Sequence, residues 1–311
     1  MKLIQFNLPG QGKRVGIVTR EDEVIDVTSE ESPGVLEVLT LAYHENISLG
    51  VLLADIQERV SAGTAMPFAP NRGDEGKLKF RDLDNPPDPN KPHLLLPIDP
   101  PEVWGCGVTY KRSADMRDED SEQDIYSRVY NADRPEIFFK ATPPRCVGAN
   151  DFVCIRSDST LTATEPELAY ILGADGEIAG YTICNDVSAW DIERENPLYL
   201  PQSKMFYGCC ALGPLFATAS EFDDPYNLNI KCVVLRDDSP IYEGEVNTEN
   251  INWKFEDLTE FLRRDNPVPL GTVVSTGTGI IVPNDLPLAH GDVVQIEVEG
   301  IGTLSNPVKQ L

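Results

Sequence analysis

The 311-residue sequence has no surplus of basic residues, no apolar run of membrane length and only three histidines. Its 26 Lys and Arg stand against 51 Asp and Glu, and the formal net charge of −25 argues against binding to nucleic acid or to an anionic membrane. The first residues reach Asn, Pro and Gly before a signal-peptide core forms, so we expect a cytoplasmic protein. The histidines are scattered, and we interpret them as structural.

The sequence also lacks a disulfide framework and a zinc-binding pattern. Its seven cysteines are odd in number, show no zinc-ligand spacing and lie mostly in apolar, strand-like segments. Buried thiols in a reducing compartment explain them best. Neither a P-loop nor a dinucleotide-binding fingerprint is present, which excludes the common nucleotide-binding folds.

What remains is the composition of an ordinary globular protein, with 41% hydrophobic and 25% charged residues. Residues 1–92 contain short strand patterns, two helical patterns and, from Ala65 to Pro92, a stretch rich in Pro, Asp, Asn and Gly that we interpret as a linker or surface loop. Residues 93–311 contain mostly short strand patterns, with clear helical patterns only after Tyr110 and in FEDLTEFLRR. We predict an α+β, mostly β protein, with a small mixed α/β domain over 1–92, including its linker, and a β-rich catalytic domain over 93–311.

Three acidic residues form the most informative pattern. Glu165 and Glu167 are two apart, so on a strand both carboxylates lie on one face. Asp175-Gly176 predicts a tight hairpin turn, and counting outward from it places Glu165 opposite Asp186. Three converging carboxylates repel one another unless a cation lies among them, and oxygen ligands suit Mg²⁺, Mn²⁺ or Ca²⁺ rather than zinc. The alternative is that the two glutamates line the solvated face of a hairpin.

Several blocks of the sequence, over roughly residues 95–311, resemble the fumarylacetoacetate hydrolase superfamily in order and spacing. The resemblance implies a C-terminal mixed β-sandwich roll, a homodimer or higher homo-oligomer, and a Mg²⁺ or Mn²⁺ ion held by Glu165, Glu167 and Asp186. The blocks are TEPELAYILG, AGYTICNDVSAWD, QSKMFYGCCALGP, VVSTGTG and GDVVQIEVEGIGTLSNPV.

One departure from the superfamily bears on the reaction. Hydrolase and decarboxylase members carry a His and a Glu, after a Tyr, that activate water. In the matching segment TYKRSADM, Ser113 stands at the His position and Met116 at the Glu position, and neither is a base at neutral pH. The departure weakens a hydrolase interpretation.

The segments GVTYKRSADMRDED and DIYSRVYNADRPEIFFKATP are similar to the sugar-acid dehydratases of the superfamily. Those enzymes act on 2-keto-3-deoxy-pentonates and yield 2,5-dioxopentanoate. The resemblance implies catalytic roles for Glu136 and Lys204. Glu136 shares a strand face with Phe138 and Lys140, which suits proton transfer at C3 or C4 of the substrate, and Lys204 either holds the substrate carboxylate or shuttles a proton.

Further polar residues are candidates for substrate binding. Hydroxyls and backbone N–H groups of the STGTG segment suit an anionic carboxylate, although the segment is also a plausible plain turn. The polar loop from Tyr110 to Ser113 suits sugar hydroxyls or a lid, although loops are commonly polar. The expected contacts are Tyr110, Arg112, Ser113, Lys140, Gln202, Thr276, Gly277 and Thr278.

The leading hypothesis is a metal-dependent hydro-lyase, with Mg²⁺ or Mn²⁺ as cofactor and a small 2-oxo acid as substrate, that dehydrates a 2-keto-3-deoxy sugar acid through an enolate. One alternative is an acylpyruvate-type C–C hydrolase or an oxaloacetate decarboxylase that uses another base. A second alternative is a non-catalytic protein that binds a metal or a 2-oxo acid. Glu136 and Lys204 favour an enzyme over the binding protein.

Overall fold

Strands drawn from residues 2 to 275 form one large mixed sheet. The structure, a computed structural model, describes residues 1–62, 78–121 and 125–311. Two short strands extend the sheet at its margins: β4 (His93–Leu94) pairs with β1, and β7 (Cys146–Val147) pairs with β13. The order across the sheet is β3 (Val24–Asp26), β2 (Gly12–Val18), β1 (Lys2–Leu8), β13 (Cys210–Thr218), β11 (Ile178–Asp186), β10 (Pro166–Leu172), β16 (Val273–Ser275), β5 (Val103–Gly107) and β6 (Glu136–Ala141).

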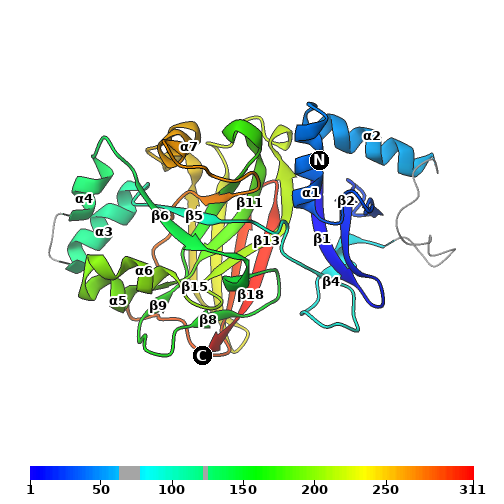
Figure 1. The fold of residues 1–311 in the computed structure, drawn as a ribbon. Helices are drawn as coiled ribbons and strands as arrows, with labels where there is room; N and C mark the ends of the chain where they lie inside the picture. Colours follow the sequence, from blue (N-terminus) through cyan, green and yellow to red (C-terminus); the bar gives the residue numbers. More distant parts are fainter. Residues whose placement is uncertain (63–77, 122–124) are drawn as a thin grey trace.

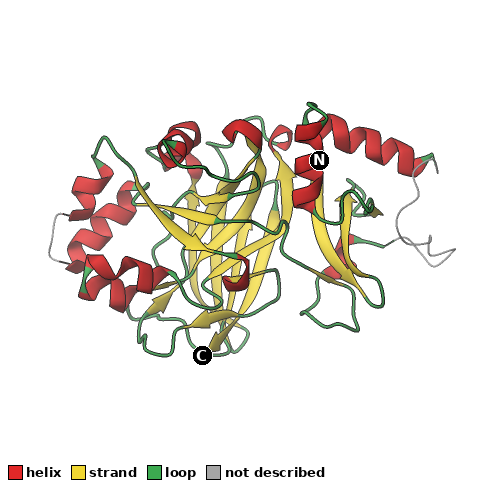
Figure 2. Ribbon diagram, viewed as in Figure 1, coloured by secondary structure: helices red, strands yellow, loops and turns green. Residues whose placement is uncertain are grey.

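A second sheet packs against the first, with β18 touching β13 and β17 touching β11. Its strands alternate between a buried and an exposed face, as in β14, where Ile230 is buried and Lys231 is exposed. Figure 2 shows the strands of both sheets in yellow at the centre of the molecule, and their buried apolar side chains belong to the main core. The order is β15 (Ser239–Asn247), β14 (Asn229–Arg236), β17 (Val293–Val298), β18 (Gly302–Gln310) and β8 (Val153–Ile155), and β12 (Ser188–Ala189) pairs separately with β9 (Thr162–Ala163).

The helices gather in three places. α1 (Val35–His44) and α2 (Leu49–Ser61) belong to the N-terminal part, and α7 (Phe255–Arg263) buries Phe255 and Leu258. A cluster of four short helices lies beside β6, on the left in Figure 1: α3 (Lys111–Ser121), α4 (Ile125–Tyr130), α5 (Trp190–Glu195) and α6 (Leu200–Lys204). Single 3₁₀ turns cover Phe80–Leu83, Pro143–Arg145, Ala174–Gly176, Pro197–Tyr199, Ala219–Glu221 and Thr248–Asn250.

The mostly β class predicted from the sequence is confirmed, and so are the helices expected after Tyr110 and at FEDLTEFLRR, which are α3 and α7. Among the described residues, no helix is long and apolar enough to cross a membrane. The boundary near residue 92 stays a prediction: β1 pairs with β13 and with β4, so strands from both predicted domains share one sheet. The part of the expected linker between residues 65 and 77 lies outside the described residues.

The hairpin of β10 and β11 sets the position of the acidic residues. The chain reverses at Asp175 and Gly176, with φ angles of 55° and 85°. A bulge between Ile171 and Leu172 shifts the pairing by one residue, and the register then continues unbroken toward the strand ends. The Asp186 N–H donates a hydrogen bond of 3.0 Å to the Glu165 carbonyl, so these residues lie opposite each other, as the count from the turn predicts.

Candidate metal centre and its pocket

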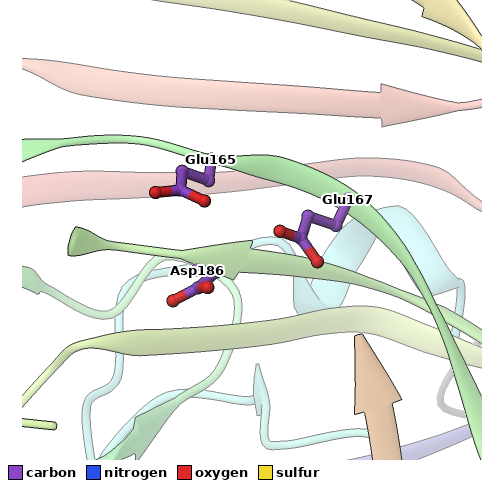
Figure 3. Close-up of side chains that lie close together, drawn as sticks. All are labelled: Glu165, Glu167 and Asp186. Carbon is purple, nitrogen blue, oxygen red and sulfur yellow. The ribbon is translucent and has the colours of Figure 1, made fainter. Parts of the chain in front are cut away.

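The side chains of Glu165, Glu167 and Asp186 meet at the open end of this hairpin (Figure 3). One carboxylate oxygen from each residue lies within 4.8 Å of the others. All three residues are at least 97% shielded from solvent, with exposures of 3%, 2% and 1%. The convergence predicted from the spacing is therefore present, and the alternative of a solvated hairpin face is wrong, because these residues are buried.

The pKa values of Glu165 and Glu167 are shifted in opposite directions. Burial, followed by the negative charges of Asp186 and Glu165, raises the pKa of Glu167 to about 8, although the Ser275 hydroxyl and the Gly277 N–H donate hydrogen bonds to it. Burial also acts to raise the pKa of Glu165, but Lys204 and Arg117 outweigh it and lower this pKa to about 2. A further cation would relieve the charge that remains on the Glu167 side.

Lys204 contacts two carboxylates of the cluster. From α6, its buried ammonium group donates hydrogen bonds of 2.9 Å to Glu165 Oε1 and to Asp186 Oδ2. Burial alone would lower the pKa of Lys204, but Asp186 and Glu165 raise it. Its Nζ also lies 5.2 Å from the centre of the Phe138 ring. The catalytic candidate thus touches two of the three expected metal ligands.

Lys140 occupies a different place from Lys204. Its Nζ lies 2.5 Å from Asp186 Oδ1 and donates hydrogen bonds to the carbonyls of Val187, at 3.0 Å, and Lys204, at 2.6 Å. These three oxygen atoms surround the ammonium group, and the side chain has no solvent exposure. The sequence predicts a substrate contact for Lys140, whereas the structure places it behind Asp186, outside the lining of the pocket.

Glu136 forms another wall of the pocket. It lies on β6 opposite Gly107 of β5, and a Cβ atom at Gly107 would overlap its carboxylate. The pair two positions along the strands repeats the arrangement, since a Cβ atom at Gly105 would overlap the ring of its partner Phe138. Burial and the nearby charge of Glu193 raise the pKa of Glu136. The two glycines therefore leave room for one carboxylate and one ring facing the acidic cluster.

Two functional candidates, Arg117 and Glu193, were not predicted from the sequence. Arg117 of α3 donates to Glu165 Oε1 at 3.1 Å and also to Glu193 of α5, and both side chains line the pocket. Trp190 of α5 donates from its indole N–H to the same Glu165 oxygen at 2.7 Å. A single arginine within the acidic helix sequence ADMRDED is the only sequence signal for this contact, and it does not identify the partner.

The remaining predicted substrate contacts divide into two groups. Ser113, Gly277 and Thr278 line the pocket together with Glu136 and Lys204. The others lie outside its lining: Tyr110 and Thr276 are buried, with the Thr276 hydroxyl bonded to the Leu168 carbonyl, and Arg112 and Gln202 are exposed. Met116, at the position of the superfamily's glutamate, packs against a small apolar cluster that contains Trp190.

Comparisons of sequence and of structure with known proteins point to the same family. Residues 102–309 match the family described as fumarylacetoacetate (FAA) hydrolase C-terminal. The chain is 48% identical over 226 residues (71% of this chain and 76% of the relative) to 2-dehydro-3-deoxy-D-arabinonate dehydratase of Saccharolobus solfataricus. It is 45% identical over 217 residues (70% and 75%) to a probable 2-keto-3-deoxyxylonate dehydratase of Haloferax volcanii. A solved 2-keto-3-deoxy-D-arabinonate dehydratase complexed with magnesium and 2,5-dioxopentanoate is similar over 100% of this chain and 99% of its own, with a TM-score of 0.80 and 38% identity.

Proposed function

Because the chain belongs to the fumarylacetoacetate hydrolase family, we propose that it is a Mg²⁺-dependent hydro-lyase that converts 2-keto-3-deoxy-D-pentonate to 2,5-dioxopentanoate. The observation that carries the proposal is one buried pocket in which Glu165 and Asp186 meet Glu136 and Lys204. The two similar dehydratases take substrates of this class, and the similar solved structure binds both the metal and the product.

The acidic cluster fits a hard divalent cation. Glu165, Glu167 and Asp186 would hold it through carboxylate oxygens, which suit Mg²⁺ and also Mn²⁺. The pKa of Glu167, raised to about 8, indicates that the buried cluster lacks positive charge. When bound, the metal supplies positive charge that polarises the 2-oxo group of the substrate and acidifies its C3 hydrogens.

We assign the two proton transfers to Lys204 and Glu136. Burial lowers the pKa of Lys204, whereas Asp186, Glu165 and Glu193 raise it. A cation bound by Glu165 and Asp186 would offset the two largest of these raising effects, which favours an amine that accepts a proton from C3. Burial and the charge of Glu193 raise the pKa of Glu136, which favours its role as the acid that donates a proton to the departing C4 hydroxyl. Water leaves with that proton and an unsaturated 2-oxo acid remains.

The same residues complete the reaction. The Glu136 carboxylate accepts a proton from C5, and Lys204 returns its proton to C3. The product of these transfers is an enol, which becomes the terminal aldehyde when its hydroxyl proton moves to C4. Both side chains end in their starting states, and the overall change is the loss of one water molecule.

Hydrolysis and decarboxylation fit the pocket less well. Ser113 lines the pocket in place of the superfamily's histidine. Met116 stands in place of the superfamily's glutamate and packs against an apolar cluster. No water-activating dyad stands at these two positions. Either reaction would therefore need another base in place of the missing His and Glu.

The experiment that tests the proposal measures turnover of 2-keto-3-deoxy-D-pentonate by metal-stripped protein, with and without added Mg²⁺. We expect 2,5-dioxopentanoate to form only with the metal. Folded, metal-loaded protein that forms no product would contradict the proposal, and acylpyruvates and oxaloacetate would then be assayed. Unchanged turnover after Glu136→Gln would contradict the role of Glu136 and indicate a different acid, whereas no turnover of any of these substrates would favour the non-catalytic interpretation.

We further infer a cytoplasmic homodimer or higher homo-oligomer in which residues 1–92 form a separate folding unit. The seven free cysteines, which include Cys184 and Cys210 at an Sγ–Sγ distance of 3.9 Å, support a reducing compartment. Light scattering on purified protein tests the assembly. Limited proteolysis near residue 92 tests the boundary. Cleavage there should release two stable fragments if the parts fold separately, and the chain should resist cleavage if the pairing of β1 with β13 makes them one unit.

A further inference from the structure

Glu193 has a buried carboxylate oxygen that the proposed reaction does not use. The residue is 4% exposed; its Oε1 accepts a hydrogen bond from Arg117 and lies 3.5 Å from the Tyr126 hydroxyl. Among the residues that the structure describes, Oε2 has no hydrogen-bond partner. Leaving such an oxygen unpaired is unfavourable, and Glu193 lines the same pocket as Glu136 and Lys204. A ligand that donates a hydrogen bond would therefore be favoured there.

Arg117 fixes where this acceptor lies. One planar guanidinium group contacts Glu165 through one terminal nitrogen and Glu193 through the other. It also lies 5.7 Å from the Tyr126 ring centre and 5.8 Å from that of Trp190, which restricts its movement. Glu193 is consequently separated from the expected metal ligands by the width of one guanidinium group. Glu165, Asp186 and Glu193 line one pocket, so a short ligand with one end at the acidic cluster could reach Glu193 with its other end.

We propose that Glu193 determines specificity by accepting a hydrogen bond from the terminal, C5 hydroxyl of the sugar acid. This inference rests on the proposed function, which places the 2-oxo acid end of the substrate at Glu165 and Asp186. The C4 hydroxyl leaves during the reaction and is served by Glu136, so the C5 hydroxyl is the donor that remains. A site built to bond a hydroxyl strongly rejects analogues that lack it. Arg117 acts as the positioning residue for Glu193.

The test compares two substrates that differ only at C5: 2-keto-3-deoxy-D-pentonate and 4-hydroxy-2-oxopentanoate of the same C4 configuration, which has a methyl group there. For the Mg²⁺-loaded enzyme we expect kcat/KM to favour the pentonate by about 100-fold or more, the range seen where a buried polar group recognises a hydroxyl. In Glu193→Gln the preference should fall below about tenfold, mainly because the pentonate loses rate. Glu195→Gln, exposed on the same helix, should keep the full preference.

Two outcomes would overturn the inference: no preference in the wild-type enzyme, or an unchanged preference in Glu193→Gln, which includes an equal loss of kcat/KM on both substrates. Glu193→Asp keeps the charge and serves as the second variant if the Gln variant does not fold. If the wild-type enzyme turns over neither substrate, the proposed function fails separately. Binding of the two compounds is then measured by calorimetry. Tighter binding of the pentonate than of the methyl analogue, with this difference lost in Glu193→Gln, supports the role of Glu193. Equal binding of the two compounds to the wild-type protein overturns it.

Discussion

Lys140 holds the backbone of Lys204 in place, through a hydrogen bond of 2.6 Å from its ammonium group to the Lys204 carbonyl. The same group pairs with Asp186, so one fully buried cation connects an expected metal ligand to the proposed base. Lys140 is positioned to organise the site rather than to contact the substrate.

Lys140→Met should therefore weaken both folding and metal binding. Breaking a buried ion pair from one side leaves an uncompensated charge and costs about 3–5 kcal/mol in the free energy of unfolding. Urea denaturation measures this loss, and calorimetry measures the Mg²⁺ affinity, which we expect to fall about tenfold or more because supporting partners orient metal ligands. The matched control is Lys231→Met, whose exposed ion pair with Glu243 spans 3.8 Å and should contribute less than about 1 kcal/mol. Equal stability of the two variants would contradict the role of Lys140.

The stability of metal-free protein should depend on pH through Glu167. Its pKa is raised from 4.5 to about 8, so between these values the unfolded chain has released the proton that the folded chain retains. Rising pH therefore favours unfolding across this window, by up to about 1.4 kcal/mol per pH unit. We expect the melting temperature in EDTA to fall from pH 5 to pH 8, and added Mg²⁺ to reduce the fall. The slope should be smaller in Glu167→Gln, and a melting temperature that stays level in wild-type protein would argue against the raised pKa.

Glu136→Gln should remove most of the catalysis while preserving the metal site. General acid–base groups contribute about 100- to 10,000-fold, so kcat should fall within this range. The Mg²⁺ affinity should stay within about twofold, since Glu136 is not among the residues of the acidic cluster. Stopped assays of 2,5-dioxopentanoate and calorimetry give the two readouts, with exposed Glu245→Gln as the control. A variant that keeps full kcat would remove Glu136 from the mechanism.

Gly107→Ala should imitate the loss of Glu136 without changing any ionisable group. The new Cβ atom would occupy the space of the Glu136 carboxylate and displace it from the pocket. We expect kcat to fall about 10-fold or more, because small displacements of a catalytic group are costly. Gly50→Ala is the control, since no atom lies within 4 Å of a Cβ atom there. Similar activity of the two variants would show that the carboxylate can move without loss.

The acidic cluster could be predicted from the sequence because strand geometry relates residue spacing to direction. Residues two apart share a face, and the turn at Asp175 and Gly176 fixes the pairing partner, so Glu165, Glu167 and Asp186 converge by counting alone. The same alternation places Glu136 and Lys140 on one face of β6. The alternation does not indicate which position along the strand lies at the pocket. It therefore does not distinguish Glu136, which lines the pocket, from Lys140, which lies behind Asp186.

Arg117 and Glu193 were missed for a different reason. They come from α3 and α5, which are separated in sequence and meet only when both helices dock beside the sheets. Helical periodicity indicates which face of a helix is apolar, but the polar residues of α3 give little periodic signal. The same limit applies to Arg112 and Gln202, which the sequence places near the substrate and the structure leaves exposed. Tertiary contacts between polar helices are not encoded in local spacing.

The hairpin turn also limits how this protein can change in length. The three side chains meet because the pairing register of β10 and β11 points Glu165, Glu167 and Asp186 to the same face of the sheet. Side chains alternate between the two faces along a strand, so a shift of one residue reverses the face. A single residue inserted between Glu167 and the turn would rotate both glutamates to the opposite face, while Asp186 stayed in place. Insertions or deletions of matched length at the turn end of both strands preserve the meeting point, and an unmatched residue does so only where a bulge absorbs it, as between Ile171 and Leu172. Homologous proteins that keep the acidic cluster should therefore vary in this hairpin by such steps, or at the turn itself.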